Sequence, residues 1–290
     1  MKSKPRNKTR KGILDFKNRT AVMGIVNITP DSFSDGNRFF DNKIAIKHAL
    51  EMIQNGADII DIGGESSRPG AKPVSVDEEL KRTIPVISAI AGKTIISIDT
   101  VKAKVAEEAL KAGANIINDI SALNADPEMA GVAAKYKCPV ILMHMLGSPQ
   151  TMQANPAYKN LYREIISYLK QSIKKAVRAG VQRKNIIVDP GIGFGKTVEH
   201  NLQLIAEMRK LKSLGLPILS GPSRKSFIGK ILDLPADQRM EGTAAAVVCS
   251  IMNGANIIRV HDVKEMVRIA RITDAIRSMK YEKMNNEGRT

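Results

Sequence analysis

The sequence predicts an α/β protein that folds as a single-domain (β/α)8 barrel, or TIM barrel. Eight short apolar segments, continuous as in parallel strands buried on both faces, alternate with eight helical patterns from residue 20 onward. Three of these strands follow one repeated pattern, GADIIDI, GANIIND and GANIIRV, in which a glycine ends the preceding helix. A chain of 290 residues fits one such barrel without a second domain.

The expected strands are rich in Ile and Val, which favour extended structure. In order they are TAVMGIVN (20–27), ADIIDIG (57–63), TIISID (94–99), NIIND (115–119), PVILMH (139–144), NIIVDP (185–190), PILSG (217–221) and NIIRVH (256–261). The expected helices lie near 43–55, 76–91, 102–112, 126–136, 158–179, 198–213, 237–253 and 262–279. We expect residues 1–18 to be a basic tail, 19–280 the barrel and 281–290 a second tail.

Composition narrows the class of protein. No apolar run approaches the length of a membrane span or resembles a secretory signal, so we expect a cytoplasmic protein without a membrane partner. Cys138 and Cys249 form neither a CxxC pair nor a disulfide framework, as in a reducing compartment, and we expect both to be buried thiols.

The net charge of +16 raises the alternative of a nucleic-acid-binding protein. Residues 1–12 alone supply six Lys and Arg residues and no acid, and the other basic residues lack interleaved aromatic side chains for stacking on bases. We therefore expect no nucleic-acid partner, and we interpret the charge as a solvated surface that attracts anionic substrates.

Every expected strand ends in a polar residue. These are Asn27, Asp61, Asp99, Asn118, His144, Asp189, Ser220 and Arg259 with His261. Single cases could be helix caps, but barrel enzymes place their active sites at the carboxyl ends of the strands. A polar end on each strand favours one shared site.

Two of the expected strand-to-helix loops are unusually long. They run from Ile28 to about Asp41 and from Gly64 to about Ser75, against a usual two to six residues. Long polar loops at this end of a barrel are typical of mobile lids.

The segment GIGFGKT after the sixth strand is neither a P-loop nor a dinucleotide-binding turn. Pro190 stands where a P-loop needs glycine, and Lys196 stands where the dinucleotide motif needs its last one. We interpret the glycines as letting the backbone approach a planar ligand, with Phe194 as an aromatic wall.

Charged residues at the last two strands indicate an anion site. Ser223, Arg224 and Lys225 follow strand seven, while Arg259 and His261, two residues apart, share one side of strand eight. The alternative for Arg259 is a structural ion pair with a core carboxylate.

Carboxylates and an amide end three of the inner strands. Asp99 and Asp189 could accept hydrogen bonds from the donor fork of a pterin, with Asn118 beside them, or could instead bind a divalent metal. Zinc motifs and the G-x-S-x-G hydrolase motif are absent from the sequence.

Taken together, eight dispersed motifs resemble the dihydropteroate synthase family over about residues 20–275. They are MGIVNITPDSFSDG (23–36), GADIIDIGGESSRPGA (56–71), SIDT (97–100), IIND (116–119), LMHMLGSPQTMQ (142–153), VDPGIGFGKT (188–197), SRKSFIG (223–229) and RVHDV (259–263). The resemblance implies an alkyl-group transferase that joins a dihydropterin diphosphate to 4-aminobenzoate and releases pyrophosphate.

The resemblance also implies roles for individual residues. Pterin binding falls to Asp99, Asn118, Asp189 and Lys225; pyrophosphate binding to Asn27, Arg259 and His261, with Asn27 also holding Mg²⁺; and 4-aminobenzoate binding to Phe33, Ser67, Arg68, Pro69, Phe194 and Ser223. The residues expected to act in catalysis are Asp99, Asp189, Lys225, Arg259 and His261. Ser67 departs from the more frequent Thr but keeps its hydroxyl.

Two alternatives to an active synthase stay open at this stage. One is a pterin-binding methyltransferase domain on a similar barrel, and the other is a catalytically silent paralogue. The resemblance further implies a homodimer.

Overall fold

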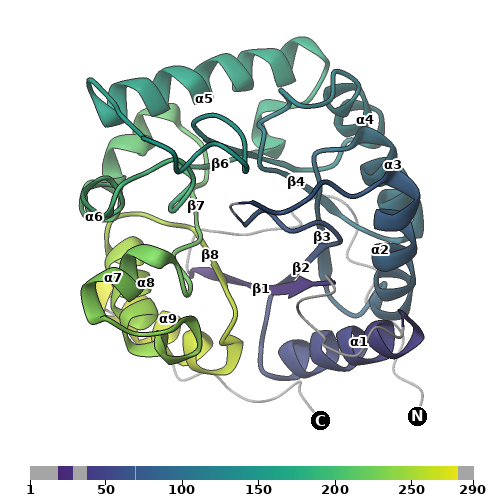
Figure 1. Cartoon of the computed structure of the whole chain (residues 1–290), viewed down its shortest axis with the longest axis horizontal. Coiled ribbons are helices and arrows are strands. Elements are labelled where there is room, and N and C mark those ends of the chain that lie inside the picture. The colour runs from purple at the N-terminus through teal and green to yellow at the C-terminus, as the bar shows by residue number, and fades with distance from the viewer. Residues whose placement is uncertain (1–18, 29–37, 69, 280–290) are drawn as a thin grey trace.

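The computed structural model describes residues 19–28, 38–68 and 70–279. Within them, eight parallel strands form one sheet in the order β6-β5-β4-β3-β2-β1-β8-β7. A bridge between Val188 and Ile218 joins β6 to the β7 side, so the sheet closes on itself. Figure 1 shows the strands as an inner ring surrounded by helices. The predicted (β/α)8 barrel is confirmed, and both expected tails, residues 1–18 and 281–290, lie outside the described residues.

Strands and helices alternate along the chain. The strands are β1 (Ala21–Asn27), β2 (Ile59–Gly63), β3 (Ile95–Asp99), β4 (Ile116–Asp119), β5 (Val140–Met143), β6 (Ile186–Asp189), β7 (Leu219–Ser220) and β8 (Ile257–Val260). The helices are α1 (Arg38–Gln54), α2 (Val76–Ile90), α3 (Ala103–Ala112), α4 (Met129–Tyr136), α5 (Leu161–Arg178), α6 (Val198–Ala206), α7 (Ser226–Leu232), α8 (Met240–Met252) and α9 (Val263–Ser278).

The repeated glycine pattern has a backbone cause. Gly56, Gly113 and Gly254 adopt φ values of 99°, 119° and 107°, a left-handed region in which other residues are strained. Gly113 caps α3, where its N–H donates to the carbonyls of Ala109 and Leu110. Each glycine thus turns the chain from a helix into the next strand.

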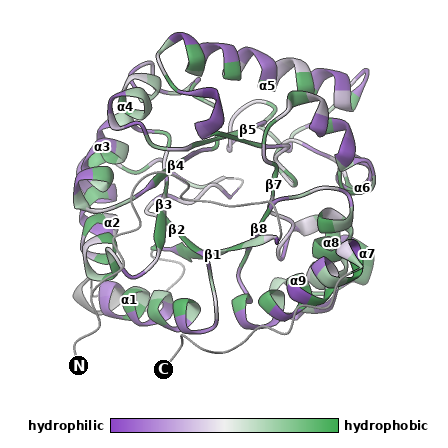
Figure 2. Ribbon diagram, turned by 180° about the vertical axis from the view of Figure 1, so that it is seen from behind, coloured by the Kyte–Doolittle hydropathy of each residue, from purple (hydrophilic) through white to green (hydrophobic). Residues whose placement is uncertain are grey.

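Side chains of the strands alternate between two apolar layers. Alternate residues pack outward against the helices, as Ile60, Ile62, Ile96 and Ile98 do. The others fill the barrel interior, which holds Ala21, Met23, Ile59, Ile95, Ile116, Ile141, Ile187, Leu219 and Ile257. Figure 2 shows hydrophobic strands at the centre and hydrophilic outward faces on the helices.

A polar layer lies next to the apolar residues of the barrel interior, toward the carboxyl ends of the strands. The polar layer lies two residues further along the strands than the apolar residues of the barrel interior. It consists of Asp61, Ser97, Asn118, Asp189 and Arg259, and all of these except Arg259 are almost fully buried. Because side chains repeat every second residue along a strand, these residues face the same interior as the apolar residues. The polar strand ends therefore meet inside the mouth of the barrel.

Several sequence expectations differ from the structure. Helix α1 begins at Arg38, so the first long loop is shorter than predicted. The helix expected over 198–213 is α6 followed by a separate 3-10 helix, Met208–Leu214. The short α7 was not expected, since seven residues carry too little periodicity to be recognised.

Two further observations concern composition. Cys138 is buried as expected, but Cys249 is exposed, so the expectation of two buried thiols is wrong for Cys249, which lies on the outer side of α8. None of the helices in the described ranges is long and apolar enough to cross a membrane.

Candidate active site

The centre of the barrel mouth is a buried ion-pair cluster built around Arg259. Its Nε donates to Asp61 Oδ2 at 2.6 Å, and its Nη2 donates to Asp99 Oδ2 at 2.7 Å. Asn118 Nδ2 donates to the same Asp61 oxygen at 3.1 Å. These contacts join residues from β2, β3, β4 and β8. In this structure Arg259 makes the ion pair with core carboxylates that the sequence left as its alternative role.

Burial sets the protonation behaviour of this cluster. Desolvation raises the pKa of Asp99 to about 7, although the nearby Arg259 opposes the rise. The other oxygen of Asp61 and the hydroxyl of Ser97 are buried and have no hydrogen-bond partner among the described residues. Such groups are costly to bury unless a ligand or water satisfies them.

A second carboxylate, Asp189, lies at the end of β6. Its Oδ1 accepts a hydrogen bond from the Gly191 N–H at 2.7 Å. Burial raises its pKa to about 6, while Gly191 and the cations Lys225, Lys196 and Arg259 limit the rise. Asp189 therefore lies buried and, at neutral pH, mostly ionised.

Lys225 precedes α7 and lies over an aromatic ring. Its Nζ is 4.0 Å from the centroid of Phe194, within the range of a cation–π contact. Desolvation, with the neighbouring Arg259 charge, lowers the pKa of Lys225 to about 8. Phe194 itself is buried with Met143 and Met152, which gives the site an apolar wall.

The end of β7 meets the end of β8 through a hydroxyl and an imidazole. Ser223 Oγ and His261 Nδ1 are 3.0 Å apart, and the backbone N–H of His261 donates to the same hydroxyl oxygen at 3.2 Å. Arg224 does not join them, because its guanidinium pairs with Asp262 at 2.5 Å. Of the two cations in the SRK motif, Lys225 is the one whose charge interacts with Asp99 and Asp189.

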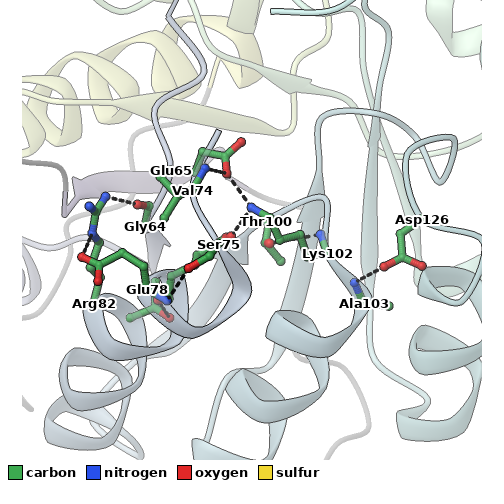
Figure 3. Close-up of polar contacts among 12 residues, drawn as sticks. Gly64, Glu65, Val74, Ser75, Glu78, Arg82, Thr100, Lys102, Ala103 and Asp126 are labelled. Atoms are coloured by element: carbon green, nitrogen blue, oxygen red, sulfur yellow. Dashed lines mark hydrogen bonds and ion pairs between the residues drawn. The ribbon is translucent and has the colours of Figure 1, made fainter. Parts of the chain in front are cut away.

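The second long loop is fastened at both ends. Glu65 Oε2 accepts from the Val74 N–H at 2.9 Å and from Lys102, whose ammonium also contacts the fully buried Glu79 at 2.6 Å. Figure 3 shows Glu65 lying between Val74 and Lys102. These contacts tie Glu65 and Val74 to Lys102, and the predicted mobility of the loop stays a prediction.

Ser67 and Asp99 line a cavity of about 370 Å³ under this loop, with further walls from Lys102, Met145 and Tyr168. The volume falls in the range of small-molecule sites. Phe194 and Ser223 are not among its lining residues, and Arg68 is exposed. The residues expected to bind 4-aminobenzoate are therefore not gathered in one cavity here.

The remaining candidates fall in two groups. Asn27, half-buried at the end of β1, is in register with Gly63. Phe33 and Pro69 lie outside the described residues. Sequence reasoning left Asp61 and Lys196 out of the site, although Asp61 stood among the polar strand ends and is two residues beyond the interior Ile59.

Comparisons with known proteins fit this geometry. The sequence profile described as "Pterin binding enzyme" matches residues 23–261. The dihydropteroate synthase of Clostridium beijerinckii is 54% identical over 261 residues, which cover 89% of this chain and 94% of that protein. This chain belongs to the dihydropteroate synthase family. Membership makes it a transferase of folate biosynthesis.

Solved structures of the dihydropteroate synthase family have the same fold. The Clostridium difficile enzyme, determined in the presence of pteroic acid, has a TM-score of 0.86 at 48% identity, covering 91% of this chain and 98% of its own. The Xanthomonas albilineans enzyme with 4-aminobenzoic acid has a TM-score of 0.85 at 41% identity, covering 91% and 95%.

Proposed function

We propose that this chain joins a dihydropterin diphosphate to 4-aminobenzoate at the mouth of the barrel, forming dihydropteroate and pyrophosphate. The observation that carries the assignment of this site is the cluster at the barrel mouth. Asp61 and Asp99 pair with the Arg259 cation, Asn118 donates to Asp61, and the charge of Asp189 acts on Arg259 from β6. A pterin presents a planar edge of donors and acceptors that buried carboxylates and an amide can match.

The pterin half of the proposed site comprises Asp99, Asn118, Asp189 and Lys225. Asp189 is suited to accept donors from the pterin because it is buried and one of its oxygens is already oriented by Gly191. The Asp61 oxygen that lacks a partner among the described residues is a further buried acceptor in the polar layer. A ligand with several N–H groups would satisfy these acceptors.

The pyrophosphate half comprises Asn27, Arg259 and His261. Arg259 carries five N–H donors and uses two of them on Asp61 and Asp99, so donors remain for an anion. Burial and the nearby Arg259 lower the pKa of His261 to about 3, so the imidazole is neutral and contributes a hydrogen bond rather than a charge.

Magnesium would accompany the pyrophosphate. The described residues contain no group of three or more His, Cys, Asp or Glu side chains able to hold a metal ion. Asn27 offers one amide oxygen, which a Cβ at Gly63 would approach to 3.4 Å. One neutral ligand fits an ion that keeps its waters and binds the substrate phosphates. When bound, Mg²⁺ neutralises charge on the leaving pyrophosphate.

The 4-aminobenzoate half comprises Phe33, Ser67, Arg68, Pro69, Phe194 and Ser223. Phe194 supplies a flat apolar surface, and Ser223 is linked to His261, so the two substrate regions share an edge. Because Ser67 lies across the mouth on the second loop, we propose that substrate binding draws this loop toward Phe194.

The proposed reaction breaks one bond and forms one. The methylene carbon–oxygen bond of the dihydropterin ester breaks and its electron pair leaves with pyrophosphate, while the arylamine nitrogen forms the new bond to carbon and then releases a proton. Arg259 and His261 stabilise the leaving anion, and Asp99 and Asp189 stabilise positive charge on the pterin. A neutral arylamine needs no strong base, so positioning dominates.

The assembly and location of the protein are also proposed. Large apolar side chains are exposed on neighbouring helices, among them Ile231, Leu232, Met240, Ile272 and Ile276. Figure 1 shows α7, α8 and α9 together on one side of the barrel. We propose that this side of the barrel is the interface of a homodimer. We also propose that the protein acts in the cytoplasm, where the exposed thiol of Cys249 stays reduced. A mass of one 31.7 kDa chain by light scattering would contradict the dimer.

The reaction itself is tested with purified protein, the dihydropterin diphosphate, Mg²⁺ and 4-aminobenzoate. We expect dihydropteroate to form, and pyrophosphate release to depend on 4-aminobenzoate. The control omits the arylamine, which separates transfer from simple hydrolysis of the ester. Folded protein that forms no dihydropteroate would contradict the synthase and support the silent paralogue; methyl transfer from a methylated folate would support the methyltransferase.

A further inference from the structure

A buried lysine outside the proposed substrate contacts stands out. Lys196 is only 3% exposed, and its Nζ donates to the Phe194 carbonyl at 2.8 Å and lies 3.1 Å from His144 Nδ1. No salt bridge to Lys196 is present among the described residues. Burial lowers the pKa of Lys196 to about 7, so the fold disfavours its charged form, and its retention indicates a task beyond packing.

The partners of Lys196 fix its role as a donor. Burial and the Lys196 charge lower the pKa of His144 to about 3, so this imidazole is neutral. The contact with the Phe194 carbonyl requires Nζ as the donor whether the amine is charged or neutral, whereas the direction of the contact with His144 Nδ1 follows the tautomer of the imidazole. The His144 ring is held in turn by Tyr168, edge-on at 4.9 Å between centroids.

Lys196 is one of three side chains that hold consecutive carbonyls of the same loop. Gln153 donates to the Gly193 carbonyl at 2.8 Å, Lys196 to that of Phe194, and Tyr158 to that of Gly195 at 2.8 Å. The Gly193 N–H donates to Asn201 at 2.7 Å. The backbone on both sides of Phe194 is thus fixed by side chains.

Close packing leaves this loop one position. Gly191 has φ 68°, and a Cβ on it would lie 1.9 Å from the His144 carbonyl oxygen, while a Cβ on Gly195 would lie 2.7 Å from Leu146. These glycines therefore let the loop pack against the chain segment after β5 rather than against a ligand. Lys196 adds a side-chain contact between the same two segments, because its Nζ lies within hydrogen-bond distance of His144 Nδ1.

We propose that Lys196 is a positioning residue that holds the Phe194 ring beneath Lys225 and so shapes the surface on which 4-aminobenzoate is received. The proposal rests on the function proposed above for the ligand, but the placement of Phe194 is a property of the free protein. Without the Lys196 ammonium, the Phe194 carbonyl loses its donor and the ring is free to turn away from Lys225.

The chain offers a direct probe, because it contains no tryptophan. Phe194→Trp places a single indole at the ring position. In this parent we expect Lys196→Met to shift the emission to longer wavelength and to raise quenching by acrylamide at least twofold. Lys196→Gln, which keeps a donor for the carbonyl, should restore much of the parent signal. The matched control is Lys104→Met, an exposed lysine on α3, which should leave emission and quenching unchanged.

A kinetic arm uses the natural Phe194. We expect Lys196→Met to raise KM for 4-aminobenzoate about tenfold, as for loss of a hydrogen bond to a charged group, with a smaller change in KM for the pterin ester. Tyr158→Phe, which removes one hydroxyl from the same loop, should act in the same direction and more weakly, and serves if Lys196→Met does not fold.

Indole emission and quenching that do not respond to Lys196→Met, or to Tyr158→Phe where the former does not fold, would overturn the proposal. Equal increases in both KM values would also overturn it, since a general loss of structure has no preference between substrates. If the protein made no dihydropteroate at all, the fluorescence measurements would still decide the role of Lys196, and only the proposed function would fall.

Discussion

Arg259→Met is expected to destabilise the protein by about 3 kcal/mol at pH 8, because breaking a buried ion pair leaves unpaired charge behind. Asp61 is fully buried and the side chain of Asp99 is 15% exposed, and both use Arg259 as their cation. The loss should shrink toward pH 5, where Asp99, whose pKa burial already raises to about 7, takes up a proton. Chemical denaturation at the two pH values measures both effects.

Two variants locate the source of this effect. Arg277→Met removes a more exposed ion pair with Asp274 on α9 and should cost at most about 1 kcal/mol. Asp61→Asn combined with Arg259→Met should recover part of the lost stability, since one unpaired charge is gone. A double variant as unstable as Arg259→Met alone would show that the Asp61 charge is not what Arg259 stabilises.

The same variant separates the two interpretations of Arg259. If Arg259 also binds the leaving group, pyrophosphate affinity should fall about tenfold or more, both in Arg259→Met and in the double variant that regains stability. Calorimetric titration with magnesium pyrophosphate measures this. An unchanged affinity would leave Arg259 with the structural ion pair alone.

Asp189→Asn is expected to weaken binding of the pterin substrate by about 1.5–3 kcal/mol while making the free protein more stable above pH 6. The variant loses a charged acceptor for the pterin but keeps the oxygen that accepts from Gly191. Stability rises because burial raises the pKa of Asp189 to about 6, which means that the fold disfavours its ionised form.

The pH dependence of this gain has a definite sign. A carboxyl whose pKa is raised in the folded state costs stability from the pH at which the unfolded chain ionises it, and the cost stops growing once the folded protein ionises it too. The advantage of Asp189→Asn should therefore be absent below about pH 4, grow as pH rises toward 6, and then stay at about 3 kcal/mol. Melting curves from pH 4 to pH 8 measure it.

Asp119→Asn is the matched control, one strand position after Asn118. Burial raises the pKa of Asp119 too, so the two carboxylates differ in their contacts: both oxygens of Asp119 are used, accepting from the N–H groups of Ser121 and Leu123 and from the Ser121 hydroxyl. Asparagine cannot replace both acceptors, so this variant should lose stability. If Asp189→Asn destabilised the protein like Asp119→Asn, Asp189 would be structural.

Much of the architecture follows from local sequence. Continuous Ile and Val segments separated by helical patterns specify parallel strands buried on both faces, and glycines such as Gly113 mark where helices end. Because side chains repeat every second residue along a strand, Asp61 and Arg259 face the same barrel interior as the apolar Ile59 and Ile257 that precede them by two residues. The position of a polar site at the barrel mouth was therefore predictable.

Only the tertiary structure decided which of these polar groups pair. Asp61 and Arg259 are nearly two hundred residues apart and meet because β8 pairs with β1, which places it one strand away from β2. The role of Lys196 depends on the close approach of two loops at Gly191 and His144, which no local pattern records. Sequence periodicity determines which face a side chain occupies, but distances between strand ends depend on closure of the sheet and on loop packing.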